Sequence, residues 1–191
     1  FATYFNRMNT ENLLQSLIET SRQIMNRLEQ LRSCDLQALT WKQNKESWSV
    51  LECIEHLNLY GDYYLSQIDK AIAQSKYPSE AVFKSGWLGN YFANSMLPKE
   101  KLNKMKTFKD KNPLNANLNL NVLDRFAEQQ MTLLNLLNKS RQVSLNKVKI
   151  ETSISKWIKM NLGDTFRFYI HHQLRHFKQI ENVLKMQKSV V

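Results

Sequence analysis

Apolar residues recur at steps of three and four along four long stretches of the chain, which is the spacing of one buried face of an amphipathic helix. In the first stretch this spacing predicts a helix over residues 10–33, with Thr10 as its N-cap. A second helix is predicted over residues 49–73, because Ser49 followed three positions later by Glu52 has the pattern of a capping box. Both helices would turn an apolar stripe toward a shared core.

A long segment, residues 74–112, interrupts the pattern after the second predicted helix and contains Pro, Gly and many lysines. Within it, the aromatic residues of 87–92 favour one short packed helix. The apolar periodicity resumes over residues 118–138 and again over 161–188. Four long helices with one extended crossover between the second and the third predict an all-α four-helix bundle, formed as a single domain by residues 1–191.

The composition favours the same fold. Glycine and proline together contribute seven residues, which is too few for a fold with many tight turns. Hydrophobic residues make up 42% of the 191 residues, enough to form a core without help from a metal ion. Cys34 and Cys53 form no CxxC pair, so we expect reduced thiols and a cytoplasmic protein. No apolar run reaches the roughly 20 residues that span a bilayer, and residues 1–15 lack the pattern of a secretion signal. We therefore expect no membrane partner.

The net charge of +10 raises the alternative of a nucleic-acid-binding protein. Six lysines of the crossover lie close together in the sequence, near several aromatic residues: Lys99, Lys101, Lys104, Lys106, Lys109 and Lys111. Glu100 and Asp110 interrupt this run, arginine is scarce there, and no helix-turn-helix or other known reader is visible. A solvated crossover explains the lysines more simply than a nucleic-acid interface.

Candidate chemistry lies in the four histidines. His172 and His176 are four positions apart, so on a helix they project from one face and both imidazoles can reach one ion. His56 lies beside the apolar stripe of the second predicted helix, and a bundle can bring it opposite the pair. Hydrogen-bonded core histidines would show the same spacing. A polar stripe on the last helix is expected to face solvent: Arg167, His171, Arg175, Lys178, Asn182 and Lys185.

Two segments of the chain resemble the DinB-like superfamily. Residues 46–57 resemble it because they contain Trp-Ser near their start and His-Leu at their end, and residues 169–180 because they contain an HxxxHxxQ pattern. The resemblance implies a four-helix bundle with a long crossover, often a homodimer, in which His56, His172 and His176 bind nickel, zinc, manganese or iron. Similar proteins include thiol S-transferases and isomerases that use a low-molecular-weight thiol, hydrolases, and DNA-damage-inducible proteins. Some carry a further histidine directly before the last ligand, where this chain has Arg175.

Further residues are candidates for the surroundings of such a site. Gln179 could orient a ligand, and Trp48 and Tyr60 could line a pocket for a small-molecule substrate, although core packing would explain the two aromatic residues equally. Glu52 could support His56 or act as a base, but closing the capping box is its simpler role. The function expected is a metal-dependent enzyme, and the alternative is a non-catalytic bundle that binds metal or dimerises.

Overall fold

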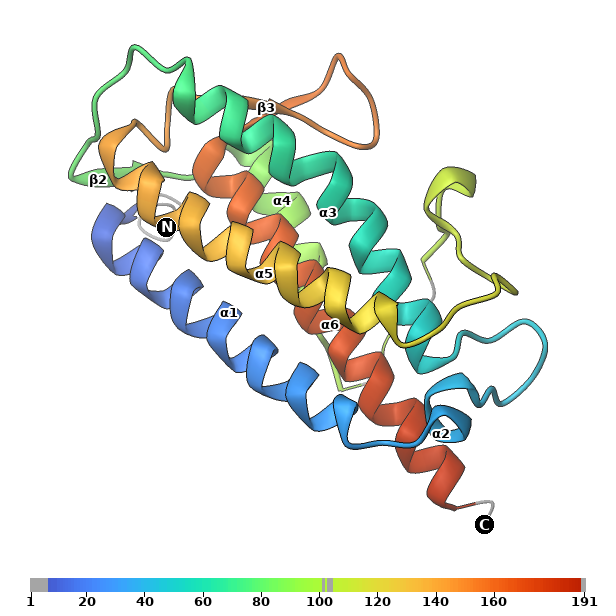
Figure 1. The fold of residues 1–191 in the computed structure, drawn as a ribbon. Helices are drawn as coiled ribbons and strands as arrows, with labels where there is room; N and C mark the ends of the chain where they lie inside the picture. Colours follow the sequence, from blue (N-terminus) through green and yellow to red (C-terminus); the bar gives the residue numbers. More distant parts are fainter. Residues whose placement is uncertain (1–6, 101, 103–104, 190–191) are drawn as a thin grey trace.

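The computed structural model describes residues 7–100, 102 and 105–189, and its four long helices confirm the all-α four-helix bundle (Figure 1). They are α1 (Thr10–Arg32), α3 (Val50–Ala73), α5 (Asn121–Lys139) and α6 (Leu162–Lys188). Shorter elements connect them: β1 (Arg7–Asn9), α2 (Leu36–Thr40), β2 (Val82–Lys84), α4 (Trp87–Ser95), β3 (Lys149–Glu151), β4 (Lys159–Asn161) and 3-10 turns at Lys109–Lys111 and Ser140–Gln142. Lys101 and Lys104 of the lysine run lie outside the described residues.

The order of the helices explains the long crossover. Both α1 and α3 pack against α5 and against α6, so α5 and α6 lie between the other two helices (Figure 1). In the same view α3 and α5 run in one direction, and α1 and α6 in the other. Because α3 and α5 are parallel neighbours, the chain must return along the whole bundle between them. The segment with β2, α4 and the first 3-10 turn makes this return.

The helix starts follow from their capping residues. Ser49 and Glu52 form the predicted capping box at the start of α3, each side chain accepting a hydrogen bond from the other residue's backbone N–H. The prediction of Thr10 as an N-cap is wrong by one position. Asn9 caps α1 by accepting from the N–H of Asn12, while the hydroxyl of Thr10 donates to the carbonyl of Glu80 in the crossover.

The predicted short helix, α4, covers one side of α6 and overturns the expectation that the whole polar stripe of α6 faces solvent. Arg167 and Arg175 are buried, with exposed fractions of 8% and 6%. Arg167 is held by four hydrogen bonds: it donates to Asp164, to Ser85 and to the side chains of Asn90 and Asn94. A buried guanidinium with these partners fixes α4 on α6.

Two small antiparallel pairings complete the fold. β1 pairs with β2, which ties the crossover to the start of α1, and β3 pairs with β4 to form the hairpin that joins α5 to α6. The side chain of Phe83 in β2 is fully buried against Gly163 at the start of α6. None of the described helices has both the length and the apolar character needed to cross a membrane.

Candidate metal centre

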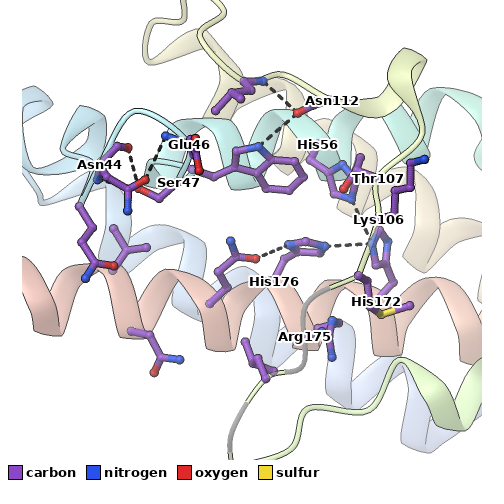
Figure 2. Close-up of a pocket in the computed structure, with 18 of the residues that line it drawn as sticks. Asn44, Glu46, Ser47, His56, Lys106, Thr107, Asn112, His172, Arg175 and His176 are labelled. Atoms are coloured by element: carbon purple, nitrogen blue, oxygen red, sulfur yellow. Dashed lines mark hydrogen bonds between the residues drawn. The ribbon is translucent and has the colours of Figure 1, made fainter.

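Three histidine side chains from two neighbouring helices meet inside the bundle (Figure 2). His56 lies in the second turn of α3, and His172 and His176 lie one turn apart on α6. Nε2 of His172 is 3.2 Å from Nε2 of His56 and 3.0 Å from Nε2 of His176. One ligand atom from each ring lies within 4.8 Å of the other two, and all three residues are buried. The packing of α3 on α6 therefore brings together residues 116 positions apart.

Hydrogen bonds on the far side of two rings fix which nitrogen carries the proton. Nδ1 of His56 lies 2.6 Å from the carbonyl oxygen of Lys111, and Nδ1 of His176 lies 3.0 Å from Oε1 of Gln179. Both oxygens can only accept, so each Nδ1 donates and each Nε2 of these neutral rings presents a lone pair. Two lone pairs are thus directed at the point where Nε2 of His172 also lies.

This donor set fits a divalent ion better than it fits a protein core without one. Nε2 of His172 can donate one hydrogen to only one of the two facing lone pairs, and its Nδ1 has no hydrogen-bond partner among the described residues. Buried polar atoms are normally satisfied, so three nitrogens that share at most one hydrogen are unfavourable. Zinc and similar divalent ions are usually bound by neutral imidazoles, and each of these imidazoles usually donates its other ring N–H to an oxygen of the protein.

The electrostatic environment keeps the three rings in this neutral form. Burial lowers the pKa of His56 to about 4. Burial also lowers the pKa of His172 and of His176 well below the usual value. The ring of His56 and the guanidinium of Arg175 lower both further, and the ring of His176 adds to the effect on His172. Imidazoles must be unprotonated to bind a metal, so at neutral pH no proton has to leave before an ion enters.

A cavity of about 700 Å³ opens beside the triad. Trp48, Tyr60 and the three histidines form its inner wall, whereas Met96, Leu102, Met105, Lys106 and Thr107 of the crossover line another side. The crossover therefore covers the pocket, a point that the sequence left open. A volume of this size is typical of sites for small molecules.

Comparisons with known proteins agree with the fold. A family model described as the DinB superfamily matches residues 7–180. The chain belongs to the DinB superfamily. Among solved structures, YfiT from Bacillus subtilis, described as a probable metal-dependent hydrolase with an unusual four-helix bundle topology, matches with a TM-score of 0.53 at 13% identity. The match covers 94% of this chain and 87% of YfiT, and at this identity it shows a shared fold. No curated protein matches the chain.

Most residues singled out around the three histidines lie at the cavity. The ring of Trp48 is centred 4.7 Å from that of His56, and its Nε1 donates to Asn112 in the crossover. The ring of Tyr60 is centred 4.6 Å from that of His172. Gln179 contacts His176 as described above. These side chains form one continuous wall with the triad.

Glu52 lies elsewhere. Its carboxylate is almost fully buried and accepts hydrogen bonds from the backbone N–H of Ser49, from Nζ of Lys42 and from the backbone N–H of Asn115. It does not line the cavity. The structure therefore places Glu52 in the capping box and in the attachment of the crossover, and not in the wall of the cavity.

Sequence reasoning missed three contributors to this candidate site. The carbonyl of Lys111 orients His56, yet a backbone carbonyl has no signature in the sequence. Arg175 and Lys106 line the cavity, although both were expected in solvated segments. His171, also expected to face solvent, is half-buried, and its Nδ1 donates to the carbonyl of Ala93 in α4. The common reason is the crossover, whose position over α6 the local pattern of α6 does not encode.

Proposed function

We propose that this DinB-superfamily chain binds one divalent metal ion through Nε2 of His56, His172 and His176 and uses it to catalyse a reaction of a small-molecule substrate. The observation that carries the proposal is the convergence of these three nitrogens on the inner wall of an open cavity. The imidazole donor set favours zinc, nickel or iron over manganese, which prefers oxygen ligands.

The number of ligands favours a catalytic over a structural ion. Among the described residues, no fourth His, Cys, Asp or Glu joins the group. Structural zinc sites are closed by four protein ligands, whereas catalytic sites keep a position for water or substrate. A non-catalytic metal-binding or dimerising bundle, the alternative function, would not need an open position beside a cavity.

The protein residues position the ligands and shape the cavity. Lys111 and Gln179 hold the rings of His56 and His176, and Trp48 and Tyr60 line the cavity beside these rings. Burial raises the pKa of Tyr60 to about 12, so its hydroxyl stays protonated at neutral pH. A divalent ion bound by the triad would lower the pKa of a water or thiol and so supply a nucleophile at neutral pH.

Two reaction types use such a nucleophile: hydrolysis and thiol S-transfer. Neither Cys34 nor Cys53 lines the cavity, and burial raises the pKa of the Cys53 thiol, so a reacting thiol must come from a low-molecular-weight cofactor. The cavity of about 700 Å³ has room for a cofactor beside a small substrate. Zinc-loaded protein should be assayed with p-nitrophenyl acetate for hydrolysis, and with 1-chloro-2,4-dinitrobenzene plus a thiol for transfer.

The metal site itself is tested by elemental analysis of protein purified without chelators. We expect about one equivalent of metal in the wild type and none in His172→Ala, whose helical content should stay intact because the core is large enough to fold without the ion. The matched control is His171→Gln, a histidine one position away on α6 that lies outside the triad. Retention of one equivalent by His172→Ala would refute the three-histidine site.

A further inference from the structure

The loop between β3 and β4 presents large apolar side chains to solvent. Trp157 in this loop is 94% exposed, and Ile154 is 42% exposed. A tryptophan normally buries most of its ring, and a ring left in water loses the stabilisation that burial would give. The exposed ring of Trp157 therefore suits contact with a partner outside the chain.

Hydrogen bonds hold this loop in one shape as it projects from the bundle (Figure 1). The hydroxyl of Tyr63 donates to the carbonyl of Thr152, and the N–H of Ser153 donates to the hydroxyl of Tyr64, so α3 supports the base of the loop. Further hydrogen bonds close the loop on itself, and one of them is donated by the N–H of Trp157. Because the loop is already ordered, its tip loses little conformational entropy when it contacts a partner.

Lysines surround the exposed ring in the sequence. Residues 147–159 contain one carboxylate, Glu151, and four exposed lysines: Lys147, Lys149, Lys156 and Lys159. Two of them, Lys147 and Lys159, form ion pairs of 3.8 and 3.4 Å with carboxylates. Lys149 and Lys156 form no ion pair within the described part of the chain. This charge favours an anionic partner and disfavours a second copy of the chain, which carries the same net charge of +10.

The size and composition of the tip favour a lipid bilayer over other anionic partners. A stable protein–protein interface buries about 800 Å² on each side, more than the tip of one short loop offers. Single-stranded nucleic acids are bound in grooves where bases stack on successive aromatic rings, whereas residues 147–159 contain one aromatic ring and no arginine. Tryptophan rings lie at the headgroup level of a bilayer, and nearby lysines are attracted to anionic lipids.

We propose that the β3–β4 loop binds the surface of an anionic phospholipid bilayer. The side chains of Trp157 and Ile154 enter the headgroup region, and Lys156 and Lys159 contact the anionic headgroups. The sequence predicted no membrane partner because no run of residues could span a bilayer, but contact with a bilayer surface needs no such run. The contact is independent of the metal centre, since no residue of this loop lines the cavity.

Co-sedimentation of the full chain with phospholipid vesicles tests this contact. Vesicles of phosphatidylcholine alone are compared with equal mixtures of phosphatidylcholine and phosphatidylglycerol. We expect binding to the anionic vesicles that weakens as salt is added. Trp157→Ala should weaken this binding about tenfold, and Lys156→Gln about fivefold. Both residues are exposed, so both variants should fold normally. Lys185→Gln, an exposed lysine in the last turn of α6, is the matched control for Lys156 and should bind like the wild type.

Several outcomes would overturn the assignment to the loop. One is equal binding to neutral and anionic vesicles, or no binding to either. Another is an affinity for anionic vesicles that is unchanged in both Trp157→Ala and Lys156→Gln. A larger loss in Trp87→Ala, which removes an 81% exposed ring of α4, would move the contact to that helix. Tighter binding of a single-stranded oligonucleotide that depends on Trp157 would make a nucleic acid the partner. The zinc content of the protein affects none of these results.

Discussion

Replacing Glu52 by alanine should reveal whether this residue stabilises the fold or takes part in the chemistry. Its carboxylate is 2% exposed and accepts three hydrogen bonds: 2.8 Å from the Ser49 N–H, 2.6 Å from Nζ of Lys42 and 2.6 Å from the Asn115 N–H. Breaking a buried ion pair costs about 3–5 kcal/mol, and losing a cap adds about 1 kcal/mol. Because the Lys42 side chain is 23% exposed and can regain some hydration, we expect a loss of about 4 kcal/mol in all.

For a chain of this length, such a loss lowers Tm by about 10 °C. The assay is urea and thermal unfolding followed by circular dichroism, with zinc content measured on the same samples. Glu52→Ala should still hold about one equivalent at saturating zinc, because Glu52 is not part of the group of three possible ligands. Glu46→Ala, an exposed carboxylate of the same segment, should change the free energy of unfolding by less than about 0.5 kcal/mol.

Two outcomes would refute this reasoning about Glu52. One is a change in stability below about 1 kcal/mol, which would mean that the three hydrogen bonds contribute little. The other is a loss of catalytic turnover with unchanged stability and zinc content, which would make Glu52 a base. In a Lys42→Met background the same substitution should cost about 1–2 kcal/mol less, since no unpaired ammonium is left behind.

Two further predictions concern the hydrogen bond between His176 and Gln179 and the packing of the start of α6 against β2. Gln179→Leu removes the acceptor for Nδ1 of His176. In a competition titration this variant should bind zinc about 10- to 100-fold more weakly, with unchanged stoichiometry. An unchanged affinity would show that the hydrogen bond from His176 to Gln179 does not orient the ring. Gly163→Ala would place a Cβ 2.3 Å from the buried ring of Phe83, so it should lower the free energy of unfolding in urea by about 2 kcal/mol. Gly86→Ala, whose new Cβ would have its nearest neighbour 3.6 Å away, should be nearly neutral. Equal stabilities of the two variants would contradict the packing of Gly163 on Phe83.

The sequence predicted those parts of the fold that depend on local pattern. Periodic apolar positions gave the four long helices to within a few residues, and the Ser49–Glu52 box is a signal contained in four consecutive residues. The pairing of His172 with His176 is local in the same sense, because four positions on a helix bring two side chains to one face. Their approach to His56 required tertiary packing, which the spacing permitted but did not determine.

Most of the other features that could not be predicted involve the crossover. Arg167, His171 and Arg175 form a polar stripe by sequence, and nothing local indicates that α4 will cover it. Specific hydrogen-bond partners allow polar side chains of this stripe to be buried: Arg167, for example, donates to Asn90 and Asn94. Those partners come from a segment about 75 residues earlier in the chain, so no window of sequence contains both halves of the contact.

The parallel arrangement of α3 and α5 connects the topology of the bundle to its candidate chemistry. A short loop cannot join parallel neighbours, so a long crossover is unavoidable, and its path along α6 supplies the carbonyl of Lys111 to His56 and one wall of the cavity. Asn115, the one described non-glycine residue with a positive φ, turns the chain directly after this contact and donates its N–H to Glu52. The same carboxylate therefore starts α3 and secures the segment that orients a ligand carried by α3. A change in the crossover near Asn115 should for this reason affect His56 before it affects His172 or His176, whose helix is held by separate contacts.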